Sequence, residues 1–216
     1  MNMKSVSSQT LQRLPQYLTY LKSLPKNAAA NISATGIAEA LGMNDVQVRK
    51  DLAMVSGSGR PKIGYIREDL VNDIEEFLGY DDADTAVIAG AGSLGRALLS
   101  YGGFEDYGLD IVAAFDTDEN IIGTEVGGKE VLDAGKLASL CRRMNIRIGI
   151  ITVPASQAQA VCDKLTQGGV LAIWNFAPVH LTVPTGVLVK NENMACSLAM
   201  LSQHLKEAWT SAIPAN

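Results

Sequence analysis

A glycine-rich turn between a short apolar run and a helical pattern is the feature that most constrains the fold of this chain. Residues 85–89 are apolar and have the length of one buried strand. The next six residues match G-x-G-x-x-G and are the first candidate binding residues: Gly90, Ala91, Gly92, Ser93, Leu94 and Gly95. In this context, the three glycines permit a tight turn, a close backbone approach to a pyrophosphate, and close helix packing on the sheet. A helical pattern continues to Tyr101, and its first N–H groups would face the phosphates.

A second apolar run supports a dinucleotide-binding unit. Residues 111–115 end at Asp116, which follows Gly95 by 21 residues. This is the spacing at which the fingerprint places an acidic residue that accepts hydrogen bonds from the adenosine ribose. A carboxylate there would also repel a 2′-phosphate, which favours NAD(H) over NADP(H). The alternative is an ordinary strand–turn–helix connection that ends in a solvated aspartate.

The rest of this half alternates short apolar runs with helical patterns. Strands are expected near 146–153, 170–174 and 187–190, and helices over 137–144 and 157–165. The alternation predicts an α/β fold with a Rossmann-type, doubly wound parallel sheet. Two loops should share the ligand-binding edge with the glycine turn, at the carboxyl ends of the strands, although plain turn chemistry explains them too. Their residues are Thr152, Val153, Pro154, Asn175, Phe176, Ala177 and Pro178.

The first 80 residues have a different pattern. Leucines at helical spacing predict a helix over 10–24 that starts near Leu14, with Pro15 in its first turn, and residues 26–32 read as a polar connection. Residues 33–55 then resemble two short helices with a turn at Gly42, and Asn44 and Gln47 stand in capping-box positions. The second helix leaves three side chains off its apolar stripe that suit base edges and phosphates: Gln47, Arg49 and Lys50. A merely solvated helix face is the alternative.

A basic hairpin follows and favours DNA binding. Residues 56–66 carry Arg60 and Lys62, which such a wing can lay along a phosphate backbone or into the minor groove. A further helix is expected over 68–78, with a boundary near 80–84. Charge divides at about the same point, because residues 1–67 carry a net charge of +6 and residues 68–216 carry −11. A basic front end on an acidic body predicts an anionic partner for the first unit.

Composition excludes several classes of protein. No apolar run approaches the roughly 18 residues of a membrane span, and the N-terminus has no apolar signal region. The three isolated cysteines read as buried apolar residues in a reducing cytosol, so we expect a cytoplasmic protein without a metal site. The last helical pattern has an apolar stripe that fits its own sheet or a second subunit: Met194, Leu198, Leu201, Leu205 and Trp209.

The combination of these motifs resembles the Rex family of bacterial redox-sensing transcriptional repressors. The resemblance is carried by 47–52, 63–65, 90–95, 115–116, 152–155, 173–178 and 201–202. It implies a winged-helix DNA-binding domain over 1–80, an NAD(H)-binding Rossmann domain over 81–190, and a domain-swapped dimerisation helix over 191–216. It also implies a homodimer that NADH releases from palindromic operators, whereas NAD+ permits binding. Tyr101 matches a tyrosine that lies near the nicotinamide in the family.

Two departures from the family pattern stand out. The wing carries Pro61-Lys62 where relatives often have Arg-Gly. Some relatives link their first and last helices through an arginine and an aspartate, and the corresponding residues here are the neutral Thr19 and Asn193. These two cannot form a salt bridge, which questions that version of the switch but not the fold.

An NAD-dependent oxidoreductase is the competing hypothesis. It needs a positioned acid or base, yet the chain has only His180 and His204, and no Tyr-x-x-x-Lys pair follows the glycine turn. A nucleotide-binding module of the CoA type is a third possibility, against which Asp116 argues. We therefore expect no catalytic residues and no enzymatic activity.

Overall fold

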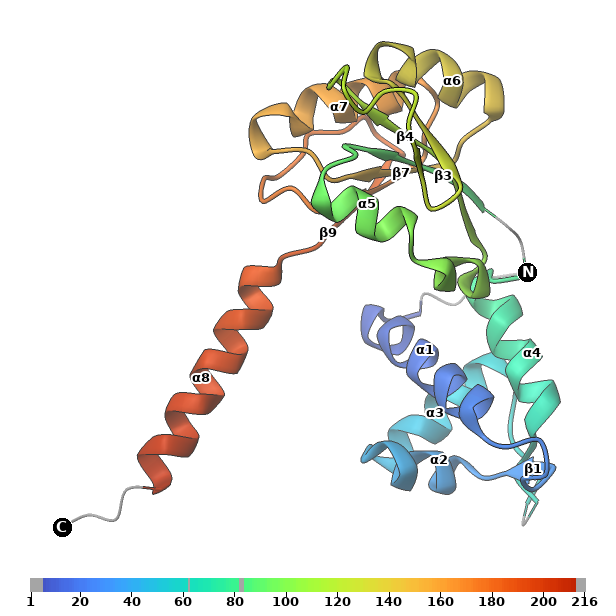
Figure 1. The fold of residues 1–216 in the computed structure, drawn as a ribbon. Coiled ribbons are helices and arrows are strands. Elements are labelled where there is room, and N and C mark those ends of the chain that lie inside the picture. The colour runs from blue at the N-terminus through green and yellow to red at the C-terminus, as the bar shows by residue number, and fades with distance from the viewer. Residues whose placement is uncertain (1–5, 62, 82–83, 213–216) are drawn as a thin grey trace. The chain divides into compact units, whose positions relative to one another are not determined.

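The structure is a computed structural model that describes residues 6–61, 63–81 and 84–212. The chain divides into two compact units, Met1–Asp82 and Ala83–Asn216 (Figure 1). Each unit has its own buried core, so each is described by itself. Among the described residues, no helix combines the length and apolar character that a membrane crossing requires.

The first unit packs helices around one core and adds a small antiparallel sheet. Its elements are α1 Ser8–Ser23, β1 Asn31–Ile32, α2 Ala34–Leu41, α3 Asp45–Val55, β2 Tyr65–Ile66 and α4 Arg67–Leu78. Strands β1 and β2 pair antiparallel, and a bridge between Arg60 and Gly64 closes the hairpin that follows α3. The core holds fully buried Leu14, Ile37, Val48, Leu52, Leu70 and Ile74. This is the predicted winged helix-turn-helix arrangement.

Helix α1 begins earlier than the sequence suggested, and the prediction that Pro15 lies in its first turn is wrong. The helix starts at Ser8, so Pro15 sits two turns inside it. Ser7 caps the helix, because its side chain accepts a hydrogen bond from the Thr10 N–H at 3.1 Å. Tertiary bonds from the Thr10 and Arg13 side chains to α3 also hold the first turns. These bonds offset the backbone hydrogen bond that a proline inside a helix removes.

The turn between α2 and α3 uses the two residues that the sequence indicates. Gly42 adopts the left-handed conformation at φ 63°, and the Asn44 side chain accepts a hydrogen bond from the Gln47 N–H at 3.1 Å. The second half of the predicted capping box is absent between these two residues. The Gln47 amide instead donates to Asp51 one turn later, at 2.9 Å. The expected polar connection before α2 also contains β1.

The second unit is built on a twisted sheet whose strand order, in the described residues, is β5-β6-β4-β3-β7-β8-β9. The strands are β3 Asp84–Ala89, β4 Leu109–Asp116, β5 Glu125–Val126, β6 Lys129–Asp133, β7 Ile148–Ile151, β8 Ala172–Asn175 and β9 Leu188–Asn191. All neighbouring strands pair parallel except β5 with β6, which form an antiparallel edge hairpin. The order reverses between β3 and β7, as in a doubly wound sheet.

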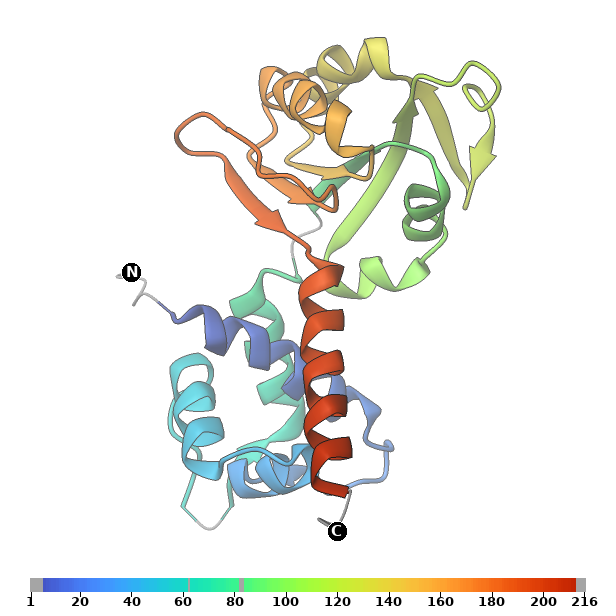
Figure 2. The ribbon, with the colours of Figure 1, turned by 90° about the vertical axis from the view of Figure 1, so that its left-hand side faces the viewer.

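Helices cover both faces of this sheet (Figures 1 and 2). They are α5 Ser93–Leu99, α6 Leu137–Met144 and α7 Ala155–Gln167, with 3₁₀ turns η1 Gly102–Tyr107 and η2 Ala134–Lys136. One face packs Val87, Phe115 and Ile151 against α6 and α7, whereas the other packs Ile88, Ala114 and Ile150 toward Leu99 of α5. The two separate clusters confirm the predicted α/β class. Helix α5 ends at Leu99, two residues short of the helical pattern.

The last helix, α8 Met194–Ala212, differs from the others because its apolar side chains are exposed. Leu198, Leu201 and Leu205 are each more than 60% exposed, and Trp209 is 75% exposed. Cys196 on the same helix is exposed too, so the expectation of three buried cysteines is wrong at this position and confirmed only for Cys141 and Cys162. A stripe of this size is unusual on a helix that has no covering partner. The stripe therefore does not pack on its own sheet in this structure.

Candidate functional sites

The glycine turn lies at the switch point of the sheet, between β3 and β7. At φ 104°, Gly90 has a conformation that side-chain-bearing residues rarely adopt. A Cβ at Gly95 would stand 1.9 Å from the Gly90 carbonyl oxygen, whereas a Cβ at Gly92 would meet no atom within 4 Å. Of the three motif glycines, only Gly92 therefore has open space where a side chain would stand, and a ligand could approach its backbone there. These surroundings fit the turn, the close packing and the pyrophosphate approach expected of the three glycines.

A cavity of about 260 Å³ opens at this edge. Six of the residues predicted to bind a cofactor line it: Gly90, Gly92, Asp116, Thr152, Val153 and Pro154. The Thr152 hydroxyl donates to the Gly90 carbonyl at 2.7 Å and so ties the β7 loop to the glycine turn. Sequence reasoning missed the lining side chains of α6 and α7, including Leu137, Gln157, Val161 and Lys164. Their helical periodicity indicated a buried face but not that part of it borders a cavity.

Asp116 contributes to the cavity wall and also braces the turn. One carboxylate oxygen accepts from the Ala91 N–H at 2.6 Å, and the other accepts from the N–H groups of Thr117 at 2.7 Å and Asp118 at 3.0 Å. The same carboxylate that was expected to meet a ribose therefore fixes the first residues of the glycine turn. Ser93 and Leu94 form the beginning of α5 directly after it.

The remaining predicted cofactor residues lie in a separate cluster that does not line this cavity. Buried Asn175 ties the loop together, donating to the carbonyls of Ala177 at 3.1 Å and Val179 at 2.9 Å and to the Asn191 side chain at 2.8 Å. Its Oδ1 accepts from the Ala177 N–H at 3.0 Å. Ala177 is buried and Pro178 is exposed. Asn175 thus shapes the loop after β8.

An aromatic row borders that loop on the α5 face of the sheet. Ring centroids lie 4.9 Å apart for Tyr101–Phe104, 5.9 Å for Phe104–Trp174 and 4.9 Å for Trp174–Phe176. Tyr101 is 54% exposed at one end of the row. The Trp174 indole N–H donates to Glu192, just before α8, at 3.0 Å. Phe104 joins Tyr101 to Trp174, and sequence reasoning did not identify it.

In the first unit, the predicted DNA-binding side chains of α3 are all exposed: Gln47, Arg49 and Lys50. Arg49 pairs weakly with Asp45 at 3.3 Å, an exposed i,i+4 contact. A surface cavity of about 420 Å³ brings Arg49 together with Arg60 of the hairpin, beside Ser33 and Thr35 at the start of α2. Lys62, the other predicted hairpin residue, lies outside the described residues. The structure thus brings one arginine of α3 and one of the hairpin to the same surface cavity, which Gln47 and Lys50 do not line.

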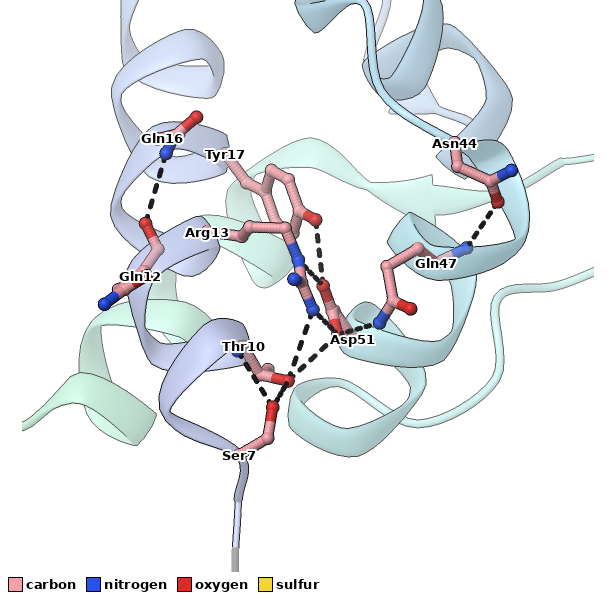
Figure 3. A network of polar contacts seen from close by, with 9 residues as sticks. All are labelled: Ser7, Thr10, Gln12, Arg13, Gln16, Tyr17, Asn44, Gln47 and Asp51. Atoms are coloured by element: carbon pink, nitrogen blue, oxygen red, sulfur yellow. Dashed lines mark hydrogen bonds and ion pairs between the residues drawn. The ribbon is translucent and has the colours of Figure 1, made fainter. Parts of the chain in front are cut away.

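The sequence did not predict the buried carboxylate of Asp51, which lies on the side of α3 that faces α1 (Figure 3). Asp51 is 1% exposed and accepts from Arg13 Nε at 2.7 Å, Arg13 Nη2 at 3.0 Å, the Tyr17 hydroxyl at 2.9 Å and the Thr10 hydroxyl at 3.2 Å. Three residues of α1 therefore hold α3 through one side chain. The available signal was the position of Asp51 on the apolar stripe between Val48 and Leu52.

The network shifts the titration of its members. Burial disfavours the charged form of Asp51, but hydrogen bonds from Arg13, Tyr17 and Gln47 outweigh it, so the pKa of Asp51 lies below its ordinary value of 3.8. Burial, followed by the hydrogen bond to Asp51, raises the pKa of Tyr17 to about 12. Tyr17 therefore stays a neutral donor and Asp51 an ionised acceptor at neutral pH.

Comparisons with known proteins cover both units. The model described as "CoA binding domain" matches residues 81–179, and the model described as "Putative DNA-binding protein N-terminus" matches residues 5–53. The redox-sensing transcriptional repressor Rex of Porphyromonas gingivalis is 40% identical over 201 residues, which are 93% of this chain and 92% of the relative. The Clostridium beijerinckii protein of the same name is 39% identical over 205 residues, 95% and 97% of the two chains.

Solved structures are also similar to this chain along nearly its whole length. RSP, a Rex-family repressor, in complex with β-NAD+ and operator DNA matches with a TM-score of 0.89 and 35% identity, over 96% of this chain and 95% of that one. RSP in complex with β-NADH matches with a TM-score of 0.85 over 96% and 97% of the two chains. Identity above 30% along nearly the whole length confirms the resemblance seen in the motifs. The chain belongs to the Rex family of redox-sensing transcriptional repressors.

Proposed function

We propose that this chain is a DNA-binding repressor that senses the NADH/NAD+ ratio, binding palindromic operators when NADH is low and leaving them when NADH binds. One observation carries the proposal. The chain joins a cavity at a Rossmann switch point, walled by Asp116, to a winged helix with a basic surface, and RSP has the same architecture in complexes with both β-NAD+ and operator DNA. A ligand that binds two states of the protein with different affinity shifts the equilibrium between them.

The cofactor would span the two clusters at the carboxyl edge of the sheet. The turn Gly90–Gly95, Asp116 and residues 152–154 would hold the adenosine and pyrophosphate, and Gly92 leaves room for that approach. The aromatic row from Tyr101 to Phe176 would border the nicotinamide, shaped by the loop 175–178. The bound dinucleotide acts here as a signal, and this chain's residues bind and orient it.

Different segments of the chain would carry out the three parts of this function. We assign DNA binding to residues 1–80 through Gln47, Arg49, Lys50, Arg60 and Lys62, cofactor binding to 81–190, and dimerisation to 191–216. The exposed stripe of α8 supports a homodimer, because a second copy of the helix would cover it. That the protein works in the cytoplasm, without a metal ion and away from membranes, stays a prediction.

We also propose that the chain has no enzymatic activity. Its relatives are named transcriptional repressors and not enzymes. Neither histidine lines the cavity beside Asp116, and His204 lies on α8 with its Nδ1 2.8 Å from the Met200 carbonyl. A dehydrogenase-like fold therefore supplies a binding site at which neither histidine stands as a general acid or base.

Fluorescence anisotropy on a labelled palindromic operator tests the proposed function. The protein is titrated without cofactor, with NAD+ and with NADH, and only NADH should abolish binding. This result would also show that the neutral Thr19 and Asn193 do not abolish the switch. Binding that ignores both cofactors would contradict redox sensing, and oxidation of NADH by a panel of keto acids or aldehydes would contradict the absence of catalysis.

Substituting Asp116 should change cofactor affinity and selectivity. Asp116→Ala removes the proposed ribose acceptor, a repulsive charge and the brace on the Ala91 N–H, so we expect NADH affinity to fall about tenfold and NADPH to be discriminated less. Titration calorimetry with both cofactors measures this. Asp118→Ala is the matched control, because Asp118 is the next acidic residue but does not line the cavity. Unchanged affinity for both cofactors would remove Asp116 from the ribose site.

Lys50 should bind a phosphate. Lys50→Ala is expected to weaken operator binding and to lower the slope of log K against log salt concentration by about 1, because one fewer counterion is released. Lys26→Ala, an exposed lysine outside α3, is the control. Anisotropy titrations at several salt concentrations provide both slopes. A slope equal to that of the wild type would exclude Lys50 from the backbone contacts.

A further inference from the structure

Gln47 combines exposure with an unusual constraint. It is exposed on α3, yet its Nε2 donates to Oδ1 of Asp51 at 2.9 Å. The two ends of a glutamine amide have nearly the same shape, so a free amide can turn over and present either its oxygen or its nitrogen. A surface glutamine on a recognition helix would therefore read several bases. Asp51 removes that freedom.

The Asp51 carboxylate accepts every hydrogen bond that the described residues make with it. Its carboxylate takes two N–H bonds from Arg13 and the hydroxyl of Tyr17, and it is 1% exposed. If the Gln47 amide turned over, its oxygen would meet a carboxylate oxygen and a hydrogen bond would be lost. Figure 3 shows the result, with Nε2 of Gln47 directed at Asp51 and the amide oxygen turned away.

This orientation has a meaning in the major groove. Adenine presents the N6 amino group as a donor and N7 as an acceptor, whereas guanine presents two acceptors, O6 and N7. With Nε2 held by Asp51, the outward oxygen of Gln47 can accept from N6 of adenine, and the second N–H of Nε2 can reach N7. Guanine would bring its O6 against the same amide oxygen. Cytosine offers an amino donor but no neighbouring acceptor.

We infer that Asp51 is a positioning residue that locks the Gln47 amide, so that α3 selects adenine over guanine at one base pair of each operator half-site. The inference rests on the proposed function and deepens it, because it names the base class that one side chain reads. Asp51 itself touches no base. It acts on specificity through Gln47.

The test uses the full chain and a set of operator duplexes. Each half-site adenine is replaced in turn by guanine and by 2-aminopurine, which still pairs with thymine and keeps N7 but lacks the N6 amino group. We expect one position where both replacements weaken wild-type binding on the order of tenfold. Gln47→Met should lose this sensitivity at that position alone and keep its salt slope, because methionine neither donates nor accepts there. Gln16→Met, on an exposed glutamine of α1, is the matched control.

A second variant tests Asp51. Asparagine can donate or accept, so Asp51→Asn frees the Gln47 amide, and the adenine-over-guanine preference at that position should shrink while binding persists. Should this variant not fold, which a thermal melt shows, the guanine replacement in the wild type decides, because a Gln47 amide that is free to turn over would tolerate guanine at the position where Gln47→Met loses its sensitivity.

The inference is overturned if Gln47→Met keeps the full base profile. It is also overturned if this variant weakens binding to all duplexes by the same factor, which is the sign of a sequence-independent backbone contact. A wild-type chain that binds no palindromic operator at all would overturn the proposed function and this inference with it. The two failures are therefore distinguishable.

Discussion

Asp51→Ala is expected to lower the free energy of unfolding by about 3–5 kcal/mol, because removing one partner of a buried ion pair strands the others. Arg13, Tyr17 and Thr10 would lose their shared acceptor, and α1 would lose its polar attachment to α3. Urea unfolding followed by circular dichroism measures the change. Asp45→Ala is the control, since the side chain of this aspartate of the same helix is 45% exposed and pairs only with Arg49 among the contacts described. A loss equal to that of the control would show that the network adds little to stability.

The same carboxylate predicts a pH dependence. The pKa of Asp51 is lower in the folded chain than its ordinary value of 3.8, so its contribution to stability is present above that value. As pH falls through the lower folded value, the carboxylate takes up a proton and the contribution is lost. The stability advantage of the wild type over Asp51→Asn should therefore be constant near neutral pH and shrink below about pH 4.

Gly95→Ala is expected to damage both the fold of the second unit and cofactor binding. The new Cβ would stand 1.9 Å from the Gly90 carbonyl oxygen, which is backbone, so α5 must move away from the sheet. We expect a loss of about 1–3 kcal/mol in stability and of roughly 10- to 100-fold in NADH affinity. NADH fluorescence titration and thermal unfolding measure the two effects.

Gly92→Ala separates the two effects and is the matched comparison. Gly92 has φ −70° and no atom within 4 Å of a new Cβ, so stability should change by less than about 0.5 kcal/mol. NADH affinity should still fall about tenfold, because the methyl group occupies the path of the pyrophosphate. If Gly92→Ala bound NADH like the wild type, the pyrophosphate would not pass over this residue.

Local rules predicted most of the fold. The apolar runs around 85–89 and 111–115, the glycine turn and the caps at Gly42 and Asn44 each depend on a few neighbouring residues, and their elements formed where expected. The edge hairpin β5–β6 was missed, because its strands are short and charged residues alternate with the apolar Val126 and Val131. Pro15 misled the start of α1, since the contacts that hold the first turns come from α3.

Some residues of the candidate site could likewise be predicted from local motifs, and others could not. Residues predicted from motifs at the ends of β3, β4 and β7 converge on one cavity, because the carboxyl ends of parallel strands meet at one edge. Lys164 and Gln157 line it from α7, and no local pattern marks where a helix borders a cavity. Asp51 depends on contacts across 34 to 41 residues of sequence, which periodicity does not reveal.

The aromatic row contains one of the intrinsic fluorophores of this protein, Trp174. The chain has only two tryptophans, and they lie in different surroundings. Trp174 packs between Phe104 and Phe176, whereas Trp209 is 75% exposed on α8. Their emission therefore carries two separable optical signals, one from the sheet edge and one from the last helix. The unlabelled protein contains its own pair of reporters.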